Sequence, residues 1–253
     1  MAITGTPTVE ALAKSGAHFA HVKSKRHPSM KKFILGTKNK MDLIDLSATE
    51  EFLDTAKTTI ERYGAEGKKI MFVTGKNESI KITRAIAEDL EMPFVAGRWL
   101  GGTFTNFTEI RKRINRMADL ESWRESGELE KKYTKLERLM LSREENKLKI
   151  RMGGLAGLTK IPDLVVIVDT NAESIAVNEA RLTGVPTIGI MSTDCDLTDA
   201  TYPIVANDAS VKTVTYILEE LSAAFKKGQG RKVKEDEKKE ATKKEEEKKE
   251  DSK

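Results

Sequence analysis

The stretch PDLVVIVDTNAESIAVNEARLTGVPTIGIM, residues 162–191, decides the fold. It opens on an apolar run that ends at Asp169, continues with helical spacing over 173–182 up to Gly184, and closes on a second apolar run over 185–191. Short apolar runs separated by a helical segment are typical of a β-α-β unit. The stretch therefore predicts two parallel strands and the helix that connects them.

The same pattern occurs earlier in the chain. The segment 69–75, KIMFVTG, predicts a buried strand, 77–91 predicts an amphipathic helix, and 93–96 predicts a second short strand. A final amphipathic helix is expected over 211–225. Strands that alternate with helices indicate an α/β fold with a mostly parallel sheet flanked by helices, whose ligands bind beyond the carboxyl ends of the strands.

The middle of the chain has a different pattern. Apolar residues recur every three or four positions on both sides of the turn at 125–127, and charged residues separate them. They are Ile110, Ile114, Met117 and Leu120 before the turn and Leu129, Tyr133, Leu136, Met140 and Leu148 after it. This pattern predicts an antiparallel coiled-coil hairpin, residues 107–150, inserted in the α/β body and projecting from it.

The last segment, 226–253, is dominated by lysine and glutamate, and Val233 is its single large apolar residue. Such a segment buries too little surface to offset its ordering entropy. We therefore expect a disordered charged tail, or a loose charged helix, after a globular body of residues 1–225.

Composition excludes several classes of protein. The 253 residues include a single cysteine, Cys195, and three histidines, which argues against disulfide scaffolds and cysteine-rich zinc modules. No apolar run approaches the roughly 20 residues of a membrane span. The N-terminus also lacks the basic and then apolar pattern of a secretory signal. The expected compartment is the cytoplasm, with no membrane partner.

The formal net charge of +4 is unevenly distributed. Residues 1–40 carry +7 and residues 98–151 carry +5, whereas 41–97 and 152–225 carry −4 and −7; the tail adds +3. Two basic segments in a nearly neutral body predict one basic face that binds a polyanion.

All three histidines lie within residues 18–27, beside a group of lysines and arginines. Contacts to RNA phosphate and ribose are predicted from His18, His21, Lys23, Lys25, Arg26, His27, Lys31 and Lys32. Structural histidines are one alternative. A metal site on His18 and His21 is another, but zinc takes three or four ligands and no third is apparent nearby, so no metal is expected.

The most distinctive stretch is AGRWLGGTFTNF, residues 96–107. Gly101 and Gly102 permit close approach of another chain, and Arg98 and Trp99 supply a cation and an aromatic plane. Thr103, Thr105 and Asn106 supply hydrogen bonds, and Arg111, Lys112 and Arg113 add charge at the base of the hairpin. A phosphate cradle for a nucleotide is the alternative. Neither G-x-G-x-x-G nor the P-loop pattern is present, so no cofactor is expected.

Several polar residues follow the apolar strands, where an α/β enzyme would place a catalytic acid. They are Asp169, Thr170 and Asn171, and further along Asp194, Asp196, Asp199 and Asp208. Carboxylates of this kind could bind Mg²⁺, but turns and helix caps explain them as well, and we favour that interpretation. Cys195 has no base at motif spacing and is expected to be a structural or incidental thiol.

Many of these stretches together resemble the bacterial small-subunit ribosomal protein S-two family. The similar stretches are 16–21, 27–34, 42–46, RWLGGTFTNF at 98–107, 152–154, 162–163, 169–171, 179–181 and 207–208. The resemblance covers about residues 9–225. It implies a flavodoxin-like α/β domain with a protruding coiled-coil hairpin.

The resemblance also implies a structural, non-catalytic role in the small ribosomal subunit. Members bind small-subunit ribosomal RNA near the head–body junction, lie beside other small-subunit proteins, and support assembly and translation. In many bacteria they help to hold ribosomal protein S-one near the mRNA exit region. Carried onto this chain, the RNA contacts would come from 18–32, 98–106 and 111–113. The alternative hypothesis is a nucleotide- or phosphate-binding α/β enzyme that depends on Asp169.

The chain departs from the family pattern at three places. Ala20 stands where glycine is usual, Ser192-Thr193-Asp194 where Asp-Thr-Asn is usual, and Asn207-Asp208-Ala209 where Asn-Asp-Asp is usual. Some bacterial members bind a metal through histidine and these aspartates. The loss of two carboxylates therefore weakens such a site here, and with it a metal-dependent contact with S-one.

Overall fold

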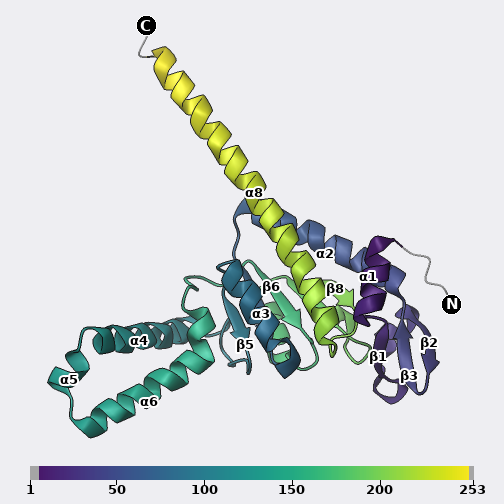
Figure 1. Ribbon diagram of the computed structural model, residues 1–253, viewed down its shortest axis with the longest axis horizontal. Coiled ribbons are helices and arrows are strands. Elements are labelled where there is room, and N and C mark those ends of the chain that lie inside the picture. Colours follow the sequence, from purple (N-terminus) through teal and green to yellow (C-terminus); the bar gives the residue numbers. More distant parts are fainter. Residues whose placement is uncertain (1–5, 251–253) are drawn as a thin grey trace.

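The computed structural model describes residues 6–250 of the chain, and their side chains as far as residue 232 (Figure 1). A five-stranded sheet lies at the centre, with helices on both faces, a smaller sheet at one end and a helical hairpin at the other. The strands of the central sheet are β4 (Ile70–Thr74), β5 (Phe94–Ala96), β6 (Leu164–Val168), β7 (Thr187–Met191) and β8 (Tyr202–Val205).

All neighbouring strands of this sheet are parallel, in the order β5-β4-β6-β7-β8. Counted along the chain, this is the order 2-1-3-4-5 of flavodoxin-like folds. Every residue of β4, β6 and β7 is buried, because helices cover both faces of the sheet. The predicted flavodoxin-like α/β fold is confirmed, including the β-α-β unit over residues 162–191.

Two groups of helices cover the sheet. The helices of the body are α1 (Pro7–Ser15), α2 (Leu46–Glu66), α3 (Asn77–Asp89), α7 (Ser174–Thr183) and α8 (Val211–Glu250). Helices α1, α2, α3 and α8 pack on the face that carries Ile70 and Phe72, whereas α7 and the base of the hairpin pack on the face that carries Met71 and Val73. Residues 46–66, for which no element was predicted, form the longest helix whose side chains are fully described.

Helices α2 and α8 cross at very short range. A Cβ atom at Gly64 would lie 2.5 Å from the carbonyl oxygen of Phe225, and one at Gly228 would lie 2.1 Å from that of Glu61. A glycine on each helix thus allows the two backbones to touch. Lys227 and Arg231 add ion pairs to Glu61 at 3.2 and 2.6 Å.

The segment after residue 225, expected to be a disordered charged tail or a loose charged helix, is helical. Helix α8 continues from the body through this boundary to Glu250 (Figure 1). Gly228 and Arg231 contact α2, and these contacts explain why the helix continues past Phe225. Amino-acid composition alone does not reveal such packing. Residues 251–253 lie outside the described part.

The inserted hairpin consists of α4 (Phe107–Glu125), α5 (Glu128–Lys132) and α6 (Lys135–Met152). The turn lies where it was predicted, with Gly127 at a φ of 71°. The predicted apolar seam is continuous on α4. On α6, however, Leu136 and Met140 are 63% and 59% exposed, so the prediction that they belong to the seam is wrong. Ion pairs replace it: buried Glu145 lies 2.9 Å from Arg124 and 3.1 Å from Lys149.

A three-stranded antiparallel sheet closes the opposite end of the molecule. Its strands are β1 (Phe19–Val22), β2 (Ile34–Lys38) and β3 (Met41–Ile44), in the order β1-β3-β2. Two 3-10 turns, η1 (Lys23–Lys25) and η2 (Pro28–Phe33), carry the basic segment from β1 to β2. Across residues 6–250, no helix is long and apolar enough to span a bilayer.

Candidate nucleic-acid interface

The distinctive loop at 98–106 is organised by Glu179, a buried residue of α7. Its carboxylate accepts hydrogen bonds from the backbone N–H groups of Gly102 at 2.6 Å and Phe104 at 2.9 Å, and from the indole N–H of Trp99 at 3.3 Å. Charge-assisted hydrogen bonds of this kind are the strong ones. The loop therefore has a fixed conformation that depends on a carboxylate 75 or more residues away.

Within this loop the side chains divide into buried and exposed groups. Trp99 is buried and packs edge-to-face on Phe104, so it contributes to the core and not to a stacking surface. Thr103 is fully buried and its hydroxyl donates to the Leu100 carbonyl, so it stabilises the loop itself, and its predicted RNA contact stays a prediction. The exposed side chains are Arg98, Thr105 and Asn106.

The basic residues at the base of the hairpin have three different environments. Arg111 is half-buried and donates to the Leu158 carbonyl at 2.6 Å, so its guanidinium holds the hairpin onto the body. Lys112 is exposed and pairs with Glu109 at 2.6 Å. Arg113 is exposed and has no carboxylate within 4.0 Å among the side chains described, so it is the residue of the three most available to an external anion.

The N-terminal basic segment is similarly divided. Lys23, Lys25, Lys31 and Lys32 are exposed on the two 3-10 turns. Arg26 instead makes a two-pronged contact with buried Asp42, at 2.5 and 2.7 Å, and holds the pKa of that carboxyl below its ordinary value. Its guanidinium thus neutralises a buried charge, and the RNA contact predicted for Arg26 stays a prediction.

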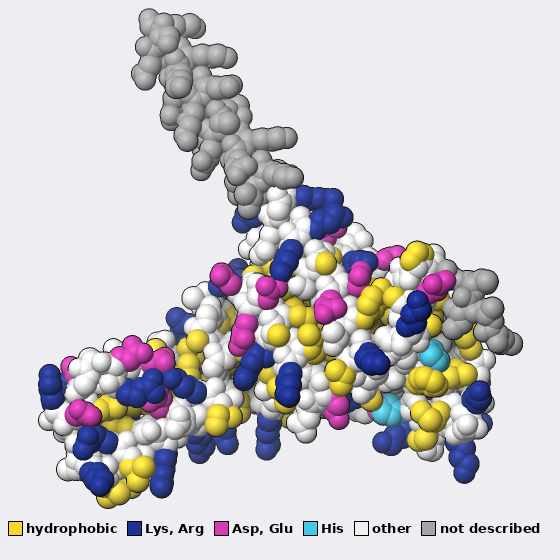
Figure 2. Space-filling view, viewed as in Figure 1, with side chains coloured by type: hydrophobic (Ala, Val, Ile, Leu, Met, Phe, Trp, Pro, Cys, Tyr) yellow, Lys and Arg dark blue, Asp and Glu magenta, His cyan; other side chains and the backbone are white. Residues whose placement is uncertain are grey.

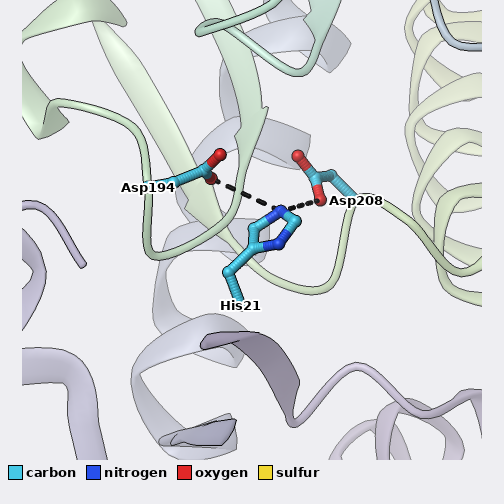
Figure 3. A group of neighbouring side chains, drawn as sticks. All are labelled: His21, Asp194 and Asp208. Carbon is cyan, nitrogen blue, oxygen red and sulfur yellow. Dashed lines mark ion pairs between the residues drawn. The ribbon is translucent and has the colours of Figure 1, made fainter. Parts of the chain in front are cut away.

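The three histidines do not form one site. The ring of His18 lies against Phe19, with centroids 4.0 Å apart, and burial lowers the pKa of His18. His27 is hydrogen-bonded to the Ser29 hydroxyl. His21 points in another direction, toward the carboxyl edge of the central sheet (Figure 3). The alternative of a metal shared by His18 and His21 is therefore wrong.

Figure 3 shows His21 between two aspartates from loops that follow β7 and β8. Its Nε2 atom lies 3.6 Å from Asp194 and 3.8 Å from Asp208. One imidazole and two carboxylates are a donor set that suits a divalent metal. Asp208, however, already pairs at 2.9 Å with the ammonium group of Lys76, so an ion here would share that carboxylate with a lysine. The prediction that no metal is bound remains a prediction.

Lys76 is the central cation of this edge. Its Nζ atom lies 2.8 Å from Asp169 and 2.9 Å from Asp208, and both aspartates are buried. Burial opposes the charge of Lys76, but the two aspartates outweigh it and raise its pKa. Asp169 also caps the following turn, since it accepts from the N–H groups of Asn171 and Ala172 at 3.0 Å. This geometry supports turn chemistry over catalysis for Asp169.

Two further titratable groups lie near this network. Burial, with a smaller contribution from Asp169, raises the pKa of Glu173 to about 7, and the Glu173 side chain lies where a Cβ on Gly75 would be. Burial likewise raises the pKa of Cys195 to about 12. A thiol with that pKa stays protonated at neutral pH, as expected for a structural cysteine.

The two basic segments lie at opposite ends of the body, on the small sheet and at the hairpin. Figure 2 shows lysine and arginine side chains projecting from the lower edge of the molecule at both ends. The polarised charge of the sequence thus corresponds to two separate basic regions along one edge of this view. Sequence reasoning missed Glu179 and Lys76 as the residues that organise the loops, because their partners are far away along the chain.

Comparison with known proteins places the chain among the ribosomal proteins. The family model described as "Ribosomal protein S2" matches residues 12–228. The chain belongs to this family, which is a family of structural proteins and not of enzymes, so the alternative of an α/β enzyme is set aside.

The similar relatives come from several bacteria. "Small ribosomal subunit protein uS2" of Salinibacter ruber is 39% identical over 233 residues, which is 92% of this chain and 72% of the relative. The protein of the same name from Mycolicibacterium paratuberculosis is 38% identical over 221 residues, 87% of this chain and 80% of the relative. The protein of the same name from Mycobacterium tuberculosis H37Rv is 38% identical over 221 residues, which is 87% of this chain and 77% of the relative.

Proposed function

We propose that this chain is a structural constituent of the small ribosomal subunit, in which it binds small-subunit ribosomal RNA near the head–body junction. The family match over residues 12–228 carries this proposal. Other small-subunit proteins would be its neighbours, and its role would be in subunit assembly and in translation. The ribosome in the cytoplasm would be its location.

The exposed basic side chains support RNA as the ligand. Lys23, Lys25, Lys31 and Lys32 at one end, and Arg98 and Arg113 at the other, are exposed and have no carboxylate within 4.0 Å among the side chains described. Such groups neutralise phosphates at little desolvation cost. Thr105, Asn106 and Lys112 are exposed beside them and can add hydrogen bonds.

The test is incorporation into small subunits by a variant that keeps the fold. We choose Arg98→Glu with Arg113→Glu, and we avoid Arg111 because its bond to Leu158 would be lost. The matched control is Lys14→Glu with Lys212→Glu, two exposed lysines of α1 and α8.

The parent chain and the control should co-sediment with small subunits, whereas the Arg98/Arg113 variant should remain at the top of the gradient with an unchanged melting temperature. Absence of the parent chain from purified subunits would refute the proposed function. Normal incorporation of the Arg98/Arg113 variant would refute the proposed contact face. Crosslinking on intact subunits then tests the head–body position.

Contact with ribosomal protein S-one is a narrower proposal that rests on the family alone. A pull-down of S-one with the tagged chain, with and without a chelator, tests both the contact and its dependence on a metal at His21, Asp194 and Asp208. Failure to recover S-one in either condition removes it from the partners.

A further inference from the structure

Two grooves flank the base of α6, and they meet at Arg151. The larger groove, of about 1030 Å³, separates the edge strand β5 and residues 97–101 from the hairpin. The smaller, of about 430 Å³, lies between α4 and α6. Leu100, Gly101 and Arg151 line both, so the two grooves form one continuous depression around the helix base.

Most of the charged side chains that line this depression are basic. The basic side chains that line it without a carboxylate within 4.0 Å, among those described, are Arg84, Arg98, Arg113, Lys147 and Arg151. All five are exposed. Two of the three carboxylates are neutralised, since Glu121 lies 2.6 Å from Lys149 and Glu144 lies 3.4 Å from Arg116. Glu88 is left as the one free acid of the described lining, against five free cations.

The floor of the larger groove is apolar. Ile150 lines it and is 80% exposed, so its side chain is accessible to a ligand in the groove. Leu100 and Phe94 lie in the same wall, and the guanidinium of Arg84 stacks over the Phe94 ring at 5.7 Å. Cations on the rim and an apolar floor suit a ligand with an anionic backbone and flat, uncharged faces.

We propose that an RNA strand passes around the base of α6 through these grooves, with its phosphates on the five free cations and a base or ribose face on Ile150. The inference rests on the proposed function and gives it a location. An acidic protein segment would match the charge, but the excess of arginine favours phosphates, which arginine binds in two-pronged fashion. This proposal adds Arg84, Lys147 and Arg151 to the RNA contacts of the proposed function.

The experiment measures binding of the full-length chain to a transcript of small-subunit ribosomal RNA, by filter retention over a series of salt concentrations. Arg98→Gln with Arg151→Gln removes two groove charges, and Lys14→Gln with Lys212→Gln is the control of equal charge. Each phosphate contact contributes about 0.7–0.9 to the slope of log affinity against log salt. The groove variant should therefore lose roughly 1.4–1.8 of that slope, while the control keeps the parent's slope.

Ile150→Ser is a second variant, which alters no charge and no buried side chain. It should weaken binding about fivefold, as when one to two methylene groups remain in water, and leave the salt slope unchanged. Unaltered affinity of Ile150→Ser, or equal slopes for the two charge variants, would overturn the groove as the RNA site. Both results are distinct from a failure of the proposed function, in which the parent chain itself binds no ribosomal RNA.

A protein occupant would give its own result. In that case the Arg98/Arg151 variant would bind the transcript like the parent and would still be lost from assembled subunits. That outcome overturns the RNA assignment.

Discussion

The carboxylate of Glu179, in α7, accepts the backbone N–H of Gly102 at 2.6 Å. This one side chain connects the helix that follows β6 to the loop that follows β5, and it also receives the N–H groups of Phe104 and Trp99. The exposed position of Arg98 at the groove thus depends on a buried acid on a different β-α unit. A buried carboxylate, which would itself repel an anion, thus holds the loop that we propose contacts RNA phosphates.

Replacement of Glu179 should therefore be costly. Glu179→Ala leaves several buried N–H donors without acceptors, and each such donor costs about 1–3 kcal/mol. We expect the free energy of unfolding to fall by about 3 kcal/mol, measured by urea denaturation. Exposed Glu219→Ala is the control and should stay within about 0.5 kcal/mol of the parent. Equal stability of the two variants would show that the loop does not depend on this carboxylate.

The close crossing of α2 and α8 gives a test of where the ordered body ends. Gly228→Ala would place a Cβ 2.1 Å from the Glu61 carbonyl oxygen, whereas nothing lies within 4 Å of a Cβ at Gly230. Gly228→Ala should destabilise the protein by roughly 1–3 kcal/mol. Gly230→Ala should stabilise α8 by up to about 1 kcal/mol through helix propensity.

The stabilities of Gly228→Ala and Gly230→Ala are measured by thermal unfolding, followed by circular dichroism. Opposite signs support packing of α8 against α2 beyond residue 225. A disordered tail would instead make both substitutions neutral.

Glu173 should make stability depend on pH. Its pKa is raised from 4.5 to about 7, mainly by burial, so the folded state binds a proton that the unfolded state has lost. The contribution of Glu173 to the free energy of unfolding is therefore fully present below pH 4.5 and is lost as the pH rises through about 7. Glu173→Gln, which mimics the protonated form, should gain up to about 3 kcal/mol at pH 8 and nothing at pH 4.

The measurement is urea denaturation of this variant and the parent at both pH values, with Glu219→Gln as the exposed control. If Glu173→Gln changed the free energy of unfolding equally at pH 4 and pH 8, the raised pKa of Glu173 would be contradicted.

Removal of the Lys76 ammonium should leave two buried aspartates without a counter-ion. Lys76→Met should cost about 3–5 kcal/mol at pH 7, the usual effect of breaking a buried pair. The deficit should shrink as the pH falls, because burial raises the pKa of Asp208 and that carboxyl then takes up a proton. Lys57→Met, which breaks a half-exposed pair with Glu220, is the control and should cost under about 1 kcal/mol.

The double variant Lys76→Met with Asp208→Asn completes this test by chemical denaturation. It should recover part of the loss, since it removes one of the two uncompensated charges. A double variant less stable than Lys76→Met alone would mean that Asp208 stabilises the fold in some other way.

Four strands of the central sheet and the turn of the hairpin follow from local patterns, whereas β8, the short edge strand Tyr202–Val205, was not predicted. Five-residue runs such as 164–168 have one stable place, between two layers of helices, and Gly127 adopts the left-handed conformation that a tight turn requires. The small antiparallel sheet was not predictable in this way, because β1 to β3 are short and only partly buried. Nor was the exposed seam of α6, where Glu145 takes an inward position that periodicity assigns to apolar residues.

The sequence by itself determined the fold class, the position of the hairpin and the two basic segments, because periodicity and composition are local properties. Only the tertiary structure decided which charges are free. Arg26 is bound to Asp42 and Arg111 to the Leu158 carbonyl, whereas Arg84 and Arg151 line one groove and have no carboxylate within 4.0 Å among the side chains that the structure describes. The physical reason is that a charge is neutralised by whatever the fold brings within about 4 Å, at any separation along the chain.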